Sequence, residues 1–158
     1  MRKSLCFWML TVLVLGFAAC SSKDNDDRTV AEKAAGAYTG TIAVTQEDGT
    51  ALGEPMPDQN IYITATGENQ VTLELKNFQF MGIPVGDLKV PNVMVKEDGT
   101  VSGSASQVPI MGGQLMADLA VSGVVKDNAA NLLIVVNAPL TAGGTPIVMN
   151  VTFVGNKK

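Results

Sequence analysis

From residue 37 onward, apolar and polar side chains alternate along the chain with a period of two. The alternation is clearest at 71–76, where aliphatic side chains alternate with Thr72, Glu74 and Lys76. Successive side chains of a β-strand point to opposite faces, so this period predicts half-buried strands. The chain shows eight such stretches, at 37–45, 61–64, 71–76, 88–95, 100–107, 115–125, 132–136 and 147–153.

The connections between these stretches alternate in length and character. Long, partly apolar loops are expected at 47–59, 78–86, 108–113 and 138–145, and tight polar turns at 67–69, 97–99 and 126–128. No predicted helix is long enough for a crossover, so neighbouring strands should pair antiparallel. The fold class is therefore predicted as all-β, an eight-stranded antiparallel up-and-down barrel whose four long loops share one end. A slip of the alternation at Pro91 and Asn92 indicates an edge position or a β-bulge.

A short helical turn is expected just before the first strand. Thr29 followed by Glu32 has the capping-box spacing, and Gly36 would end a helix over 30–35. A helix this short is marginal alone, so it must dock on the domain to persist.

The first twenty residues have the order of a secretory signal. Basic residues are followed by an apolar run and then by Ala18, Ala19 and Cys20. A cysteine at this place resembles the bacterial lipoprotein signal, in which the cysteine is lipidated and becomes the new N-terminus. We therefore expect a signal peptide at 1–19 and a lipid anchor on Cys20; an uncleaved signal anchor is the alternative, although the apolar run is short of the roughly 20 residues that span a bilayer.

Residues 20–33 are expected to be a lipid-anchored acidic tether that includes the short helix. Its Asp24, Asp26 and Asp27 resemble the surface-export signal of Bacteroidetes lipoproteins, with an ordinary solvated linker as the alternative. The predicted location is the outer membrane, with cell-surface exposure left open. The barrel domain follows at 34–158, and its tight-turn end would face the membrane.

Composition excludes several classes of function. Removal of Arg2 and Lys3 with the signal leaves 11 − 2 = 9 basic residues against 15 acidic ones, which disfavours nucleic acid as a partner. The chain has no histidine, so neither a histidine-based triad nor an imidazole metal ligand exists. Glu74 and Asp118 are expected on the outer face, where solvated charge is the usual state. The protein is predicted to be no enzyme and to need no cofactor or metal.

The rim of long loops carries the candidate binding residues. They share an apolar side chain in a loop, and they are Met56, Met81, Ile83, Val85, Ile110 and Met111. Such residues form a cavity mouth or a docking patch, or else fold inward and plug the barrel. A membrane-spanning barrel is disfavoured, because it needs aromatic girdles and an apolar outer band that Glu74 and Lys76 would interrupt.

Three segments resemble the calycin-like β-barrel domain of Bacteroidetes lipoproteins. They are 35–41 (Ala-Gly-Ala-Tyr-Thr-Gly-Thr), 73–78 (Leu-Glu-Leu-Lys-Asn-Phe) and 86–91 (Gly-Asp-Leu-Lys-Val-Pro). The resemblance spans roughly residues 34–155 and implies a lipocalin-related barrel with a lipid or other apolar ligand. Lipocalins have Gly-x-Trp where this chain has Gly36, Ala37 and Tyr38, and no partner arginine lies near the C-terminus.

The expected function is a membrane-anchored, non-enzymatic lipoprotein that binds a small apolar ligand or lipid. The alternative is a structural or interaction protein of the cell envelope, with a filled barrel whose loop rim docks a partner protein. The same aliphatic strand faces suit a cavity or a solid core, so the sequence leaves both open.

Overall fold

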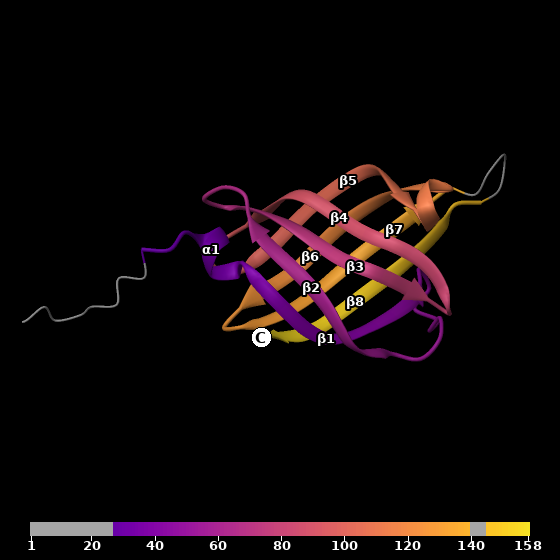
Figure 1. Ribbon diagram of the computed structural model, residues 1–158, viewed down its shortest axis with the longest axis horizontal. Helices are drawn as coiled ribbons and strands as arrows, with labels where there is room; N and C mark the ends of the chain where they lie inside the picture. The colour runs from indigo at the N-terminus through magenta and orange to yellow at the C-terminus, as the bar shows by residue number, and fades with distance from the viewer. Residues whose placement is uncertain (1–26, 140–144) are drawn as a thin grey trace, which may run out of the picture.

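The computed structural model describes residues 27–139 and 145–158, and the predicted signal peptide and Cys20 lie outside them. The described chain forms a closed barrel in which each strand pairs with its sequence neighbours and β1 pairs with β8. All pairings are antiparallel, so the predicted fold class is confirmed. The barrel follows one short helix (Figure 1). In chain order the elements are α1 (Val30–Ala34), β1 (Gly36–Gln46), β2 (Met56–Ala65), β3 (Gln70–Phe80), β4 (Ile83–Val95), β5 (Thr100–Ile110), the 3-10 turn η1 (Met111–Gly113), β6 (Leu115–Lys126), β7 (Ala129–Ala138) and β8 (Ile147–Lys157).

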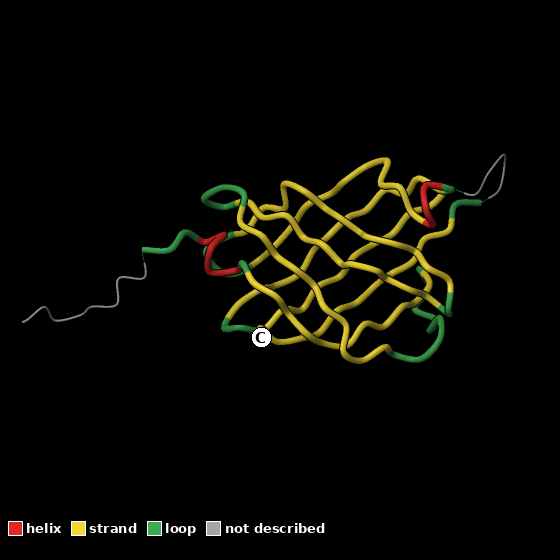
Figure 2. The backbone as a smooth tube through the Cα atoms, in the orientation of Figure 1, coloured by secondary structure: helices red, strands yellow, loops and turns green. Residues whose placement is uncertain are grey.

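The connections divide between the two ends of the barrel as expected. Helix α1, the β2–β3 and β6–β7 turns and the C-terminus lie at one end, here called the helix end (Figure 1). The β1–β2 connection, the β3–β4 turn and η1 lie at the opposite end, here called the rim end (Figure 2). This arrangement follows from strict up-and-down order, because alternate connections return to the same end.

Two of the four predicted long loops are wrong. A third, expected at 47–59, ends earlier because β2 begins at Met56, and most of the fourth, at 138–145, lies outside the described residues. Segment 78–86 is a hairpin, in which β3 continues to Phe80, β4 begins at Ile83 and only Met81 and Gly82 connect them. Both connecting residues have positive φ, 50° and 76°, as in the turns that match the twist of paired strands. Segment 108–113 is not a long loop either, since β5 reaches Ile110 and η1 occupies Met111–Gly113. The glycines and prolines of these segments indicated loops, but pairing with the neighbouring strands keeps much of both segments extended.

The irregularity predicted at Pro91 and Asn92 is a β-bulge. Val71 pairs with Val93 and Leu73 with Val90, so β4 carries one residue more than β3 between these pairs. Asn92 has φ of 55°, which is the left-handed conformation that asparagine tolerates better than most residues. The barrel is closed, so the alternative of an edge strand does not apply.

Aliphatic side chains from every strand fill the interior of the barrel. Along β6 the burial alternates almost without interruption from Ala117 to Val125. Among the described residues no polar or charged residue is classed as buried, and no buried side-chain polar atom lacks a hydrogen bond. Burial of apolar area is therefore the main stabilising term, at about 25 cal/mol per Å². The most deeply buried large side chains are Tyr38, Phe153, Ile42, Ile61, Leu73, Leu75, Leu88, Leu119 and Ile134.

Helix α1 has the predicted capping box and is docked on the barrel. The Thr29 hydroxyl accepts from the Glu32 N–H at 3.2 Å, and Glu32 Oε2 accepts from the Thr29 N–H at 2.7 Å. Ala31 and Ala34 are buried, and the Ala31 N–H donates to the Glu68 carbonyl oxygen in the β2–β3 turn at 3.1 Å. Docking thus supplies the stability that a five-residue helix lacks alone. No helix within 27–139 or 145–158 has the length and apolar character to cross a bilayer.

Candidate apolar ligand site

A wholly apolar cavity of about 230 Å³ lies inside the rim end and is called the apolar well below. Strands β1, β3, β4, β5, β6, β7 and β8 all contribute to its wall, because their inward positions near this end converge on it. Its lining residues are Val44, Phe78, Phe80, Ile83, Val85, Leu88, Ile110, Met111, Leu115, Val136, Ala138, Ile147, Met149 and Val151. Every one of these side chains is apolar, so the well offers a ligand no hydrogen bond from a side chain.

The structure brings four of the six predicted mouth residues together at the apolar well. Val85 and Ile110 are buried in its wall, Met111 is half-buried, and Ile83 is 50% exposed at its margin. Met56 and Met81 lie elsewhere, around a neighbouring hollow of about 260 Å³. Met81 is 72% exposed and points its apolar surface to solvent.

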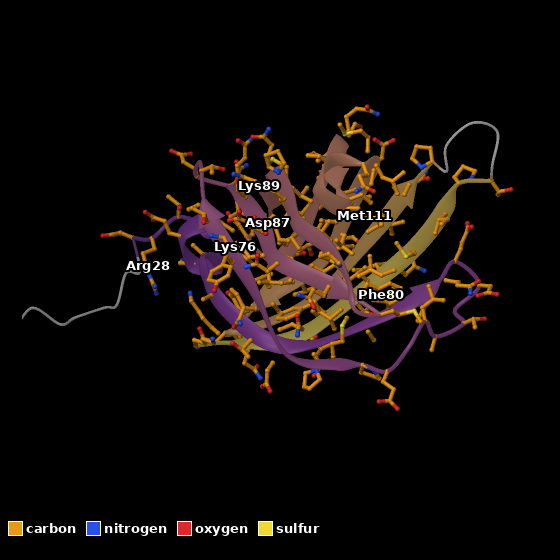
Figure 3. All side chains as sticks on the ribbon, turned by 45° about the vertical axis from the view of Figure 1, so that its right-hand side comes forward. Arg28, Lys76, Phe80, Asp87, Lys89 and Met111 are labelled. Atoms are coloured by element: carbon orange, nitrogen blue, oxygen red, sulfur yellow. The ribbon has the colours of Figure 1, made fainter. Side chains whose placement is uncertain are left out.

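The predicted mouth residues did not include the remaining lining residues, although Phe78 and Phe80 fall within the expected loop at 78–86. Phe78 and Phe80 sit at the end of β3, while Ile147 and Met149 begin β8. Their inward alternation could have identified them as rim-end positions, but it does not distinguish a filled core layer from the wall of a cavity. Figure 3 shows Phe80 and Met111 at the rim end, away from Arg28 at the helix end.

A larger outer groove of about 780 Å³ adjoins the well and shares Phe80, Ile147 and Met149 with it. Polar residues from the end of β1 and the start of the β1–β2 connection line one side of this groove, namely Gln46, Glu47 and Asp48. Asp48 Oδ1 accepts a hydrogen bond of 2.9 Å from the Thr50 N–H, and this bond lowers the pKa of the Asp48 carboxyl group. The groove therefore places negative charge beside the apolar well.

The described residues hold no cluster of acidic, histidine or cysteine side chains that could bind a metal ion. Glu74 lies 3.6 Å from Lys76 Nζ on the outer wall, and Asp118 Oδ1 accepts from the Gln107 N–H at 3.1 Å. These two carboxylates thus have structural partners outside the barrel, where they were expected.

Comparison with known proteins agrees with this architecture. The closed barrel is similar to the crystal structure of a protein from Bacteroides fragilis that is provisionally named an outer membrane protein, with a TM-score of 0.62 and 19% sequence identity. The match covers 82% of this chain and 53% of that protein, so this chain spans about half the length of its structural neighbour. No curated protein matches the chain. Residues 34–156 match the family described as the calycin-like beta-barrel domain. The chain therefore belongs to the calycin-like β-barrel domain family.

Proposed function

We propose that this protein is a lipid-anchored, non-enzymatic binding protein of the cell envelope whose apolar well holds part of a small apolar ligand. The observation that carries the proposal is the well itself, which lies inside the barrel and is lined by apolar side chains alone. A cavity of 150 Å³ with such a lining stays dry and binds benzene in another protein, so about 230 Å³ suffices for a small apolar group. It is smaller than the roughly 300–1,000 Å³ of a drug-sized site, which favours the end of an alkyl chain.

The proposed location rests on the N-terminal sequence and on the structural neighbour. Lipidation of Cys20 would attach the helix end to a membrane through residues 20–29, so that the rim end faces away from it. The neighbour from Bacteroides fragilis, provisionally named an outer membrane protein, supports the envelope as the location. Surface exposure is part of the same proposal and rests on the acidic tether.

A second candidate function is docking of an envelope protein on the rim end. The observation that favours it is the exposed apolar surface there, since Met81, Ile83 and Ile147 are 72%, 50% and 42% exposed. Exposed apolar side chains grouped at one end are typical of interaction surfaces. In this alternative the small well is a packing defect beneath the docked partner.

The two candidates differ in what the purified protein carries and binds. Native mass spectrometry of protein from its own cells should show a stoichiometric apolar molecule if the well is a ligand site. Decanol titrated into protein with isotope-labelled methyl groups should shift the signals of Val85, Ile110 and Ala138, which line the well, in a saturable way.

The matched variants are Val85→Phe and Val154→Phe. Val85 lies in the wall of the well, whereas Val154 is 60% exposed on the outer wall, so only the first substitution fills the cavity. Decanol binding should be lost in Val85→Phe and retained in Val154→Phe. Protein that is repeatedly empty and shows no saturable shift would exclude ligand binding and favour the docking function.

A further inference from the structure

The apolar well and the outer groove together form a site with two chemically different parts. Phe80, Ile147 and Met149 border both, so the groove offers a place for the rest of a ligand whose apolar end occupies the well. The polar side of that groove carries Glu47 and Asp48. Among the described residues, no lysine or arginine lines either part.

Charged residues are distributed unevenly between the two ends of the barrel. Within the described chain, every basic residue except Lys76 and Lys89 belongs to the helix end; these residues are Arg28, Lys33, Lys96, Lys126, Lys157 and Lys158. The same end carries acidic residues that balance them, namely Asp27, Glu32, Glu68, Glu97, Asp98 and Asp127. Figure 3 shows Lys76 and Lys89 on the wall, apart from Phe80 and Met111 at the rim end. The β1–β2 connection and the first residues of β2, in contrast, carry Glu47, Asp48, Glu54 and Asp58.

The acidic residues of the groove favour one charge on the head group of a bound amphiphile over the other. A carboxylate or phosphate head group in the groove would lie beside Glu47 and Asp48, which carry the same sign of charge. No lysine or arginine among the described lining residues would pair with it. A cationic head would face Glu47 and Asp48, and the hydrogen bond from the Thr50 N–H keeps the Asp48 carboxylate charged. These carboxylates are exposed, so the preference is moderate and is weakened by salt.

We propose that the site selects amphiphiles with one alkyl chain and a cationic, ammonium-type head group, and disfavours fatty acids and other anionic lipids. This inference rests on the proposed function, because it requires that the apolar well bind an alkyl chain. It names the ligand class by charge, which neither the fold nor the family assigns.

The test compares three probes with a ten-carbon chain, decyltrimethylammonium, decanol and decanoate, each below its micelle concentration or solubility limit. Dissociation constants are measured by the methyl-signal titration at low and at high salt. The ammonium probe should bind most tightly and decanoate most weakly, with a ratio between them of roughly fivefold or more at low salt. At about 1 M salt the screening length falls to about 3 Å, so the charge-dependent ratio of the dissociation constants should approach one.

The repeated Glu-Asp-Gly-Thr sequence at 47–50 and 97–100 supplies a matched control. In each copy the aspartate accepts a hydrogen bond from the threonine N–H, at 2.9 Å for Asp48 and 2.8 Å for Asp98. Asparagine keeps the accepting oxygen, so the double variants Glu47→Gln/Asp48→Asn and Glu97→Gln/Asp98→Asn lose charge while retaining the turn. Only Glu47→Gln/Asp48→Asn lies at the rim end, so only this double variant should abolish the preference for the ammonium probe over decanoate.

The outcomes separate this inference from the proposed function. Equal or tighter binding of decanoate by the unaltered protein would overturn the charge selection and leave the ligand site intact. An equal loss of preference in both double variants would also overturn it, because the preference would then reflect the overall acidity of the chain. Failure of all three probes to bind would overturn both proposals.

Discussion

The Tyr38 hydroxyl donates a hydrogen bond of 2.8 Å to the carbonyl oxygen of Ala34, the last residue of α1. Tyr38 lies on β1 and is 1% exposed, so this bond fastens the helix to the end of the barrel from inside. Lys157, near the end of β8, completes the arrangement: its Nζ lies 6.0 Å from the centre of the Tyr38 ring and donates to the Lys33 carbonyl oxygen at 3.5 Å. Tyr38 and Lys157 thus hold helix α1 against the helix end of the barrel.

The first prediction concerns this bond. Tyr38→Phe leaves the buried Ala34 carbonyl without its hydroxyl partner, which should lower the free energy of unfolding by about 1 kcal/mol and the melting temperature by about 3–5 °C. Tyr62→Phe, at the exposed tyrosine, is the control and should change melting very little. Equal effects of the two substitutions would contradict a special role for the Tyr38 hydroxyl.

The same variant should alter stability in alkali. Burial raises the pKa of the Tyr38 phenol above its ordinary value of 10.0, so the folded state holds this proton more tightly than the unfolded state. The contribution of Tyr38 is therefore fully present below pH 10 and is lost as the pH rises toward its folded pKa. Thermal melts in this alkaline range should show a smaller decline for Tyr38→Phe than for the unaltered protein.

A second prediction concerns the seam between the first and last strands. Gly40 pairs with Gly155 across β1 and β8, and a Cβ added at Gly40 would collide with the Val154 carbonyl oxygen. Gly40→Ala should therefore destabilise the protein by about 1–3 kcal/mol, because backbone cannot move aside as a side chain can. In the control Gly67→Ala, the nearest atom is Gln70 Cβ at an ordinary 3.5 Å. Urea unfolding should show a lower midpoint for the first variant alone.

A third prediction separates two methionines that the sequence grouped together. Met81 and Met111 both have positive φ, 50° and 52°, so aspartate is equally acceptable to the backbone at either position. Met81 is 72% exposed, and Met81→Asp should change stability by less than about 0.5 kcal/mol. Met111 packs against the core and lines the apolar well, so Met111→Asp should cost about 1–3 kcal/mol. Similar melting temperatures for the two variants would show that Met111 is as exposed as Met81.

A fourth prediction tests the anchor. Cys20→Ser removes the thiol that lipidation requires, so the variant should be recovered in the aqueous fraction after cell lysis. Fractionation followed by immunoblotting measures this directly, and Cys6→Ser, within the expected signal peptide, is the control. Membrane attachment that survives Cys20→Ser would exclude lipid anchoring through this residue.

The alternation of side chains was enough to predict the strands and their order, because the inward or outward direction of a residue is a local property of extended backbone. It also located the bulge at Asn92, where the alternation slips. It failed at 78–86, since Gly82, Pro84 and Gly86 resemble a loop when hairpin pairing is ignored. Pro84 in fact pairs with Gln79 inside the β3–β4 ladder.

The contact between Tyr38 and Lys157 could not be predicted from the sequence. The sequence has no arginine near the C-terminus, and in the structure the basic side chain beside the Tyr38 ring is that of Lys157. The two residues lie far apart in the chain, and β1–β8 pairing brings them together by placing Tyr38 opposite Lys157. Nothing in the neighbourhood of either residue in the sequence signals this contact.

The sequence by itself thus determined which residues face inward, where the turns between strands fall at the helix end, and which N-terminal cysteine could carry lipid. Only the tertiary structure decided that seven strands converge on the apolar well, and that Glu47 and Asp48 line an outer groove that adjoins it. The reason is physical: strand periodicity is fixed within a few residues, whereas a cavity and the groove beside it depend on contacts between segments that are distant in the chain.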